Sequence, residues 1–376
     1  MNDSSSLQSA KRVVIKIGSA LLVNTERGEL HQAWLESIAD DIAKMKLRGQ
    51  EIVIVSSGAI ALGKYCLAIN KARLRLDEKQ AAAAAGMIRL AHAYQEALGE
   101  HNLTVAQVLL TLSDSESRRR YINARNTLNS LVRLGAIPLI NENDTVATDE
   151  IRFGDNDRLA ARVAAMISAD VLILLSNVAG LYKKDPHNNP HALKIDVIKG
   201  NISSEIEAMA GKSSSTEGSG GMITKLQAAR ISMNAGTRMV ITDGRKMNPI
   251  TTLEKTNTGT WFIPNQNPMA ARKNWIASAL KPMGKITVDN GAIRALSLGK
   301  SLLPAGVINV KGDFQKGDAV VLETPKGIEL ARGLTAYSSA DAIRIKGHKT
   351  NEIETLLGYR GRDELIHRDD MVLIEN

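Results

Sequence analysis

The chain of 376 residues contains one cysteine, Cys66, and no hydrophobic run of the length that a membrane span needs. A single cysteine excludes an internal disulfide and a zinc site built from cysteines. The start, MNDSSSLQSAKR, has no apolar leader segment, and no later stretch approaches about 18 uninterrupted apolar residues. Because a reducing compartment suits such a chain, we expect a cytoplasmic protein without a membrane segment.

Two common nucleotide-binding motifs are also absent. No G-x-x-x-x-G-K-[ST] sequence occurs, and no G-x-G-x-x-G sequence follows the first predicted strand. A Walker-type phosphate loop and a dinucleotide-binding fold therefore lose their main sequence support.

Length and charge indicate the number of domains and the class of partner. Single hydrophobic cores stop growing near about 250 to 300 residues, so this length predicts two domains. Of the 48 basic and 40 acidic residues, positions 285–376 hold 13 of each, which leaves 35 against 27 before them. The net charge of +8 thus lies in the first part. It indicates a solvated surface or attraction to a polyanionic small molecule, although charge alone leaves nucleic acid open.

The first part of the chain alternates short apolar runs with longer helical patterns. The runs lack strict polar alternation, as expected for strands covered on both faces. Helices are predicted in HQAWLESIADDIAKMKLRG, NDRLAARVAAMISA and TKLQAARISMNAG. We predict an α/β fold, a three-layer sandwich with a mostly parallel central sheet, in which ligands bind beyond the carboxyl ends of the strands. The predicted strands are Val13–Ile17, Ile52–Val55, Ile137–Ile140, Val171–Leu175 and Met239–Ile241.

The pattern changes after TWFIPNQNP. Short β-rich pieces such as KITV, VINV and AVVLET then alternate with turns such as LPAG and TPKG. This indicates a small strand-rich domain. We expect a first domain over residues 1–265, a linker over 266–283, and the strand-rich domain with a carboxyl-terminal tail over 284–376.

Residues that suit a phosphate follow several predicted strands. Lys16 lies inside the first strand, and Gly18 and Ser19 come after it. Further along, GKSSSTEGSGGMITK leads into a helix. Glycine lets backbone N–H groups approach an anion, and a helix N-terminus favours negative charge. Each signal also has a plainer explanation, since a Gly/Ser run is often only a loop and a lysine at a strand end can reach water.

Seven segments resemble one known family, in the expected order and spacing. They are VVIKIGSALL, IVIVSSGAIALG, KQAAAAAG, YINARNTL, PLINENDTVATDEIRFGDND, GLYKKDP and GSGGMITKLQAA. From about Lys11 to Trp275 the chain resembles the glutamate 5-kinases of the amino acid kinase family, and INEND followed by FGDND is the most specific part. From Gly284 to about Arg362, with ITVDNGA, SLLPAGV and GDFQKGD, it resembles a PUA domain.

The resemblance implies an enzyme that phosphorylates the γ-carboxylate of L-glutamate with ATP and magnesium, giving γ-glutamyl phosphate on the way to proline. It also implies feedback inhibition by proline, and we expect a homo-oligomer. By the same likeness the catalytic residues are Lys16, Asp157 and Lys225, and the substrate-binding residues are Ser57, Asp144 and Asn156. The implied ATP-binding residues are Lys16, Ser176, Asn177, Ser219, Gly220, Gly221, Met222, Ile223, Thr224 and Lys225, with magnesium carried mainly by the ATP phosphates.

The chemistry of this reaction fits those residue types. A γ-carboxylate, with a reference pKa near about 4.3, is already ionised at neutral pH and needs no general base. The obstacle is to bring an anion up to a polyanionic triphosphate, and two lysines with a metal ion address that obstacle directly.

Alternatives remain open for single residues and for the function. Ser57 could be only a helix cap, Asp157 only a charge at a helix N-terminus, and Asp144 only a turn residue. Ser176-Asn177 stands where many relatives have Thr-Asp, so a carboxylate that would contact the nucleotide is missing. The alternative functions are another amino acid kinase with a different acceptor, such as N-acetylglutamate or carbamate, and RNA binding through the carboxyl-terminal domain.

Overall fold

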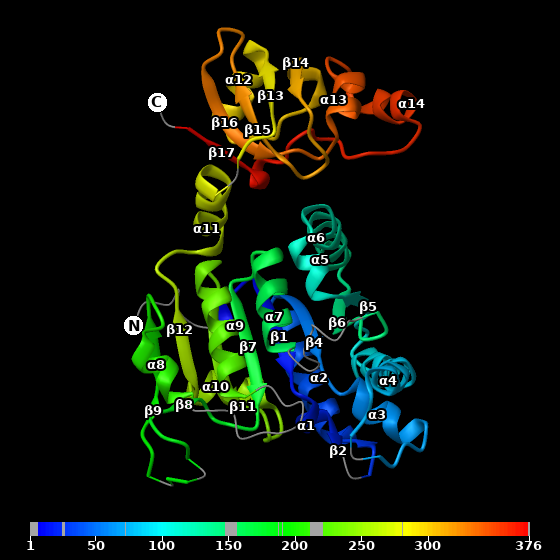
Figure 1. Cartoon of the computed structure of the whole chain (residues 1–376), viewed down its shortest axis with the longest axis vertical. Coiled ribbons are helices and arrows are strands. Elements are labelled where there is room, and N and C mark those ends of the chain that lie inside the picture. Colours follow the sequence, from blue (N-terminus) through cyan, green and yellow to red (C-terminus); the bar gives the residue numbers. More distant parts are fainter. Residues whose placement is uncertain are drawn as a thin grey trace. The chain divides into compact units, whose positions relative to one another are not determined.

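The computed structural model describes residues 7–24, 27–71, 73–146, 156–186, 188–189, 191–210, 221–279 and 281–374. The chain divides into two units (Figure 1). The first comprises Met1–Glu116 and Ala124–Pro268, and the second comprises Ser117–Asn123 and Met269–Asn376. The boundaries at residues 265 and 284 stay a prediction.

The first unit is built on an eight-stranded sheet in the order β10-β12-β11-β7-β1-β4-β6-β5. All its neighbouring pairs run parallel except β11 and β12. All five strands predicted from the sequence are confirmed. The strands are β10 (Val197–Lys199), β12 (Thr260–Ile263), β11 (Arg238–Asp243), β7 (Val171–Ser176), β1 (Arg12–Ile17), β4 (Glu51–Ser56), β6 (Ile137–Glu142) and β5 (Val105–Leu110).

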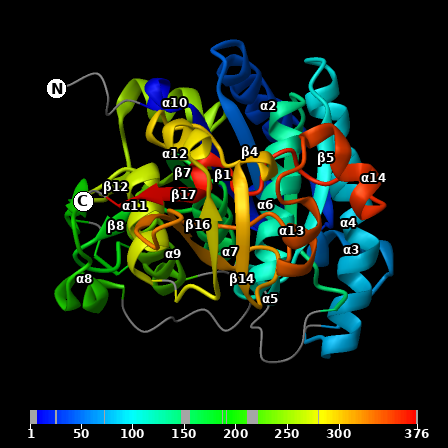
Figure 2. The ribbon, with the colours of Figure 1, turned by 90° about the horizontal axis from the view of Figure 1, so that it is seen from above.

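Helices cover both faces of this sheet, which makes the predicted three-layer α/β sandwich. Figure 2 shows α2 and α10 on one side of the strands and α7 and α9 on the other. The core on the α2 side contains Val13, Ile15 and Ile17 of β1. Because side chains alternate along a strand, Lys16 faces the other layer, the one that α7 forms. The helices are α1 (Ser19–Leu22), α2 (Gln32–Leu47), α3 (Ala59–Cys66), α4 (Leu76–Gly99), α5 (Leu112–Glu116), α6 (Arg118–Arg133), α7 (Asn156–Met166), α8 (Ser204–Met209), α9 (Met222–Asn234) and α10 (Pro249–Thr256).

The alanine-rich run lies on α4, and α4 packs unusually closely on α3. A Cβ atom built on Gly63 would lie 1.6 Å from the Ala82 carbonyl oxygen, and one built on Gly86 would lie 1.8 Å from the Ala59 carbonyl oxygen. Only glycine permits this backbone-to-backbone approach. The alanine run AAAAAG at positions 81–86 thus belongs to a helix that packs closely on its neighbour.

The second unit contains a five-stranded sheet in the order β14-β13-β15-β16-β17. The predicted strand-rich domain is confirmed. Its elements are β13 (Gly284–Val288), α12 (Asn290–Ser297), β14 (Val307–Gly312), β15 (Ala319–Glu323), β16 (Glu329–Leu334), α13 (Ser339–Ile345), α14 (Ile353–Leu357) and β17 (Met371–Leu373). Two-residue strands elsewhere are β2 (Val23–Asn24), β3 (Glu29–Leu30), β8 (Leu181–Tyr182) and β9 (Lys194–Ile195).

Helix α11 (Pro268–Asn274) continues into a π-helical turn, Trp275–Ala279, that packs within the second unit. Ile276 is fully buried with Ala319 and Leu334, and Arg332 Nη1 donates to the carbonyl oxygen of Ala277 at 2.9 Å. In the parts of the chain that the structure describes, none of the helices has the length and apolar character needed to cross a bilayer.

Candidate active site

The carboxyl ends of the central parallel strands meet beside Lys16. The Ser57 N–H donates to the Ile17 carbonyl oxygen at 3.1 Å, so the chain after β4 lies against the end of β1. On the other side, the register of β1 and β7 pairs Ile17 with Leu175, which leaves Gly18 and Ser176 side by side. Residues from three strand ends thus line one edge of the sheet.

Asp157, on the first turn of α7, lies between two lysine ammonium groups. Its Oδ1 is 2.6 Å from Lys16 Nζ, and its Oδ2 is 3.1 Å from Lys225 Nζ. Asp157 is fully buried, and the two lysines are 7% and 6% exposed. Buried charges are tolerated when they are paired, and these three residues together carry one surplus positive charge. An anionic ligand would neutralise that charge.

The lysines keep the Asp157 carboxyl ionised. Burial by itself would raise the pKa of Asp157, but the attraction of Lys16 and Lys225 outweighs it and lowers that pKa to about 2. The carboxylate is therefore a permanent anchor for both ammonium groups at neutral pH.

The first turn of α9 brings a further donor to the same carboxylate. Thr224 Oγ1 lies 3.0 Å from Asp157 Oδ2 and 2.8 Å from the carbonyl oxygen of Gly221. Gly221 is the N-cap residue of α9 and has no side chain that could cap the helix. The helix thus presents Thr224 and Lys225 to Asp157 from adjacent positions.

Gly18 leaves space beside the Lys16 ammonium group. A Cβ atom there would come no nearer than 3.7 Å to the Leu175 carbonyl oxygen and 3.9 Å to Lys16 Nζ, both ordinary contacts. Its φ of −75° is open to any residue. Packing against the described residues therefore does not require glycine at this position, whereas close approach of a ligand to the backbone would.

Asn156 and Ser57 form a second group of polar side chains next to Asp157. Asn156 Nδ2 donates to the Ser56 carbonyl oxygen at 2.9 Å and to Ser57 Oγ at 2.8 Å. Asn141 Nδ2 donates to the same Ser56 carbonyl oxygen at 2.8 Å. Asn156 is 6% exposed, and its Oδ1 is buried without a hydrogen-bond partner among the described residues. Both hydrogens of Nδ2 are used, so Oδ1 remains as an acceptor for a ligand that donates.

Asp144 follows β6 and is 9% exposed. Among the described residues, its carboxyl group has no hydrogen-bond or ion-pair partner. Burial raises the pKa of Asp144 to about 6. An enclosed carboxyl group of this kind suits a cation brought by a ligand.

The remaining predicted ATP-binding residues lie at two places. Ser176 ends β7 at 6% exposure, and its Oγ is 3.4 Å from Asn177 Oδ1. Gly221, Met222 and Ile223 open α9 beside Thr224. Ser219 and Gly220 fall outside the described residues, as does the FGD part of FGDND.

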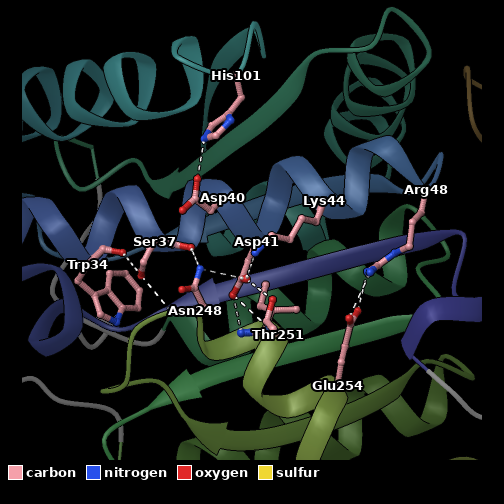
Figure 3. Close-up of polar contacts among 11 residues, drawn as sticks. Trp34, Ser37, Asp40, Asp41, Lys44, Arg48, His101, Asn248, Thr251 and Glu254 are labelled. Carbon is pink, nitrogen blue, oxygen red and sulfur yellow. Dashed lines mark hydrogen bonds and ion pairs between the residues drawn. The ribbon is translucent and has the colours of Figure 1, made fainter.

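Helix α2 fixes the segment that follows β11. Trp34 Nε1 donates to the Gly244 carbonyl oxygen at 2.7 Å, and the Gly244 N–H donates to the Ser176 carbonyl oxygen at 2.7 Å. Figure 3 shows the same helix contacting the start of α10. There Asp41 Oδ2 accepts from the N–H groups of Ile250 at 2.8 Å and Thr251 at 3.2 Å.

Comparison with known proteins agrees over nearly the whole chain. The amino acid kinase family model matches residues 11–243, and the PUA domain model matches 284–357. The glutamate 5-kinase of Paramagnetospirillum magneticum is 57% identical over 369 residues, which cover 98% of this chain and 99% of that protein. The glutamate 5-kinase of Rhodospirillum rubrum is 56% identical over 360 residues, which cover 96% of each chain.

The chain belongs to the amino acid kinase family. The resemblance to glutamate 5-kinases, together with the PUA domain, is confirmed by these matches. In a solved structure of the Giardia lamblia carbamate kinase bound to AMP-PNP, the match covers 69% of this chain and 100% of that chain, at 17% identity and a TM-score of 0.49.

Several contacts in this amino acid kinase site were not predicted from the sequence. Thr224 was included only as part of a nucleotide-binding segment, and its contact with Asp157 crosses 67 positions. Asn141 was not singled out, although its place at the end of a predicted strand, in INEND, was a usable signal. The contact of Trp34 with Gly244 spans 210 positions and leaves no local sequence pattern.

The described part of the site offers a metal ion few protein ligands. In the described ranges no three or more His, Cys, Asp or Glu side chains are grouped so that they could hold a metal ion. Asp157 is already paired with two lysines.

Proposed function

We propose that this protein transfers the γ-phosphoryl group of ATP to the γ-carboxylate of L-glutamate, which gives γ-glutamyl phosphate and begins the biosynthesis of proline. The observation that carries the proposal is the buried pair of lysines held by Asp157 at the carboxyl edge of the sheet. The glutamate 5-kinases that match this chain over nearly their whole length support the choice of acceptor.

In this proposal Lys16 and Lys225 lie on either side of the transferred phosphoryl group. Charge spreads over the equatorial oxygens of that group in the transition state, and fixed cations around it contribute several kcal/mol of stabilisation. Asp157 orients both ammonium groups and offsets part of their charge. No side chain has to remove a proton from the acceptor, because the γ-carboxylate is already ionised.

The acceptor is recognised by Ser57, Asp144 and Asn156. The Asp144 carboxylate pairs with the α-ammonium group of glutamate, and Asn156 Oδ1, which is buried without a partner among the described residues, accepts a further hydrogen bond from it. N-acetylation removes that positive charge, so the same site disfavours an N-acylated acceptor.

The nucleotide occupies the edge formed by Ser176, Asn177 and the start of α9, from Gly221 to Lys225. The amino end of α9 favours a phosphate group. Magnesium neutralises phosphate charge during transfer and is carried mainly by the ATP phosphates, since the described part of the site presents no cluster of protein ligands for it.

We further propose that the activity lies in the cytoplasm and that residues 1–265 form the catalytic domain. We also expect that the enzyme is a homo-oligomer and that proline inhibits it. The support for these statements is the family resemblance and the single cysteine.

The direct test is an acceptor profile with ATP and magnesium. Hydroxylamine traps an acyl phosphate as a hydroxamate, so product can be counted with L-glutamate or N-acetylglutamate as acceptor, and release of ADP measures transfer to carbamate. We expect L-glutamate to have the highest kcat/KM by at least about a hundredfold, because an unpaired polar group in the site rejects analogues strongly. A preference for N-acetylglutamate or carbamate would refute the proposal.

A further inference from the structure

Thr224 has one hydroxyl proton and two acceptors within reach, Asp157 Oδ2 at 3.0 Å and the Gly221 carbonyl oxygen at 2.8 Å. The Gly221 carbonyl oxygen already accepts from the N–H groups of Thr224 at 3.1 Å and Lys225 at 3.4 Å. Hydrogen bonds to an ionised acceptor are roughly twice as strong as neutral ones. The hydroxyl proton therefore goes to the carboxylate.

The three donors to Asp157 differ in stiffness. Lysine is a rotatable point charge on a flexible four-carbon stem, so Lys16 and Lys225 can follow the carboxylate if it turns. Threonine is β-branched and has few side-chain rotamers on a helix. Thr224 also stands on the first turn of α9, which fixes its backbone. Of the three donors, Thr224 is the one that sets the orientation of the carboxylate.

We propose that Thr224 is a positioning residue for phosphoryl transfer, whose hydroxyl holds Asp157 in the orientation in which both lysines face the transferred group. This inference rests on the proposed function, because it takes Lys16 and Lys225 as the groups that stabilise the transition state. It differs from a contact of Thr224 with the nucleotide, since Thr224 acts here through Asp157.

The test compares two substitutions of nearly the same size. Thr224→Val keeps the β-branch and removes the hydroxyl, whereas Thr224→Ser keeps the hydroxyl. A misplacement of about 1 Å at a reacting centre can cost up to about a hundredfold in rate. We expect Thr224→Val to lower kcat by about tenfold or more, with KM for ATP and glutamate within about threefold, and Thr224→Ser to stay within about threefold of the original kcat.

Thr252 provides a matched control. It is a half-buried threonine on α10, and its hydroxyl makes no hydrogen bond with a described residue. Thr252→Val should leave kcat unchanged within about twofold, because it removes a hydroxyl from a helix without touching the lysine–aspartate group. If Thr224→Val fails to fold, Thr224→Ala removes the same hydroxyl in a better helix-forming residue.

A second genetic background separates the positioning role from a direct contact of Thr224 with the nucleotide. In an Asp157→Asn protein, adding Thr224→Val should change kcat by less than about twofold, because the group that Thr224 positions is gone. An equal loss in both backgrounds, or a raised KM for ATP with unchanged kcat, would show a nucleotide contact and overturn the inference. Normal kcat in Thr224→Val would overturn it as well. If the unaltered protein phosphorylates no glutamate, it is the proposed function that fails.

Discussion

At the scale of residues, an ion pair with Asp157 explains why Lys16 stands in a strand whose other residues are nearly all buried. Lys16 faces the α7 layer, and its ammonium group is 2.6 Å from Asp157 Oδ1. The sequence predicted this lysine and its neighbours Asp157 and Lys225 as catalytic residues through family resemblance. It could not predict the third donor, Thr224, because that contact depends on how α9 packs on α7.

Removing one lysine should impair the chemistry more than the fold. Lys16→Met or Lys225→Met leaves Asp157 with one partner, so no buried charge is left unpaired and the melting temperature should change little. The loss of a fixed cation at the transferred group should lower kcat by about a hundredfold or more. Lys255→Met, on the exposed side of α10, is the control for steady-state kinetics and melting. Turnover near the original value would remove that lysine from the mechanism.

Asp144 should make glutamate binding depend on pH. Burial raises its pKa to about 6, so below pH 6 the carboxyl is protonated and cannot pair with an ammonium group. We expect KM for glutamate to fall as pH rises through about 6 and then to level, with KM for ATP nearly constant.

The substitution Asp144→Asn separates charge from turn formation, since asparagine also favours turns. It should raise KM for glutamate by about tenfold or more at pH 8 and abolish its change near pH 6. A role confined to the turn predicts instead that this variant behaves like the original protein in both respects.

At the scale of elements, the sheet and its main helices can be predicted from local hydrophobic patterns, whereas the contact that holds the start of α10 cannot. The five central strands are apolar without alternation, and α2 shows helical spacing, so both could be predicted. Strand β5 is partly exposed at an edge of the sheet, and α10 receives its N-terminal acceptor from Asp41, more than 200 positions earlier. Neither the edge position of β5 nor the acceptor for α10 can be predicted from the residues of that strand or helix alone.

Asp41 should be important for stability through α10. It is 1% exposed and accepts two N–H groups from the first turn of that helix. Asp41→Ala leaves those two donors, one buried and one half-buried, without their acceptor, which should lower the free energy of unfolding by about 2 kcal/mol in urea titration. Asp40→Ala, one position away and with a 54% exposed side chain, should cost much less. Equal losses in the two variants would contradict this role.

At the scale of the whole molecule, the change of pattern after TWFIPNQNP predicted a second domain, which the structure contains as its second unit. The sequence did not reveal that α11 and the π-helical turn pack within that unit, because no local pattern in them identifies the residues that they contact. Ile276 is buried against Ala319 and Leu334, which lie far from it in the sequence.

A chain ended at Pro268 should therefore fold and retain kinase activity. Every residue placed in the transfer precedes Pro268, and the cut removes Ile276 together with Ala319 and Leu334, the residues it is buried with. A chain ended at Pro282 should be less soluble, since it keeps Ile276 without its partners. Circular dichroism and the hydroxamate assay measure both. A well-folded but inactive 1–268 chain would show that catalysis needs the second unit.

The proposed function requires that the γ-carboxylate of glutamate attacks the γ-phosphorus atom of ATP at the lysine–aspartate group. Glutamate labelled with ¹⁸O in its γ-carboxylate tests it, because hydroxylamine attacks the acyl carbon of γ-glutamyl phosphate and releases phosphate with the bridging oxygen. Mass spectrometry of that phosphate should find one ¹⁸O atom for each hydroxamate formed. Phosphate without ¹⁸O, released at the same rate, would mean that water is the acceptor and would contradict the claim.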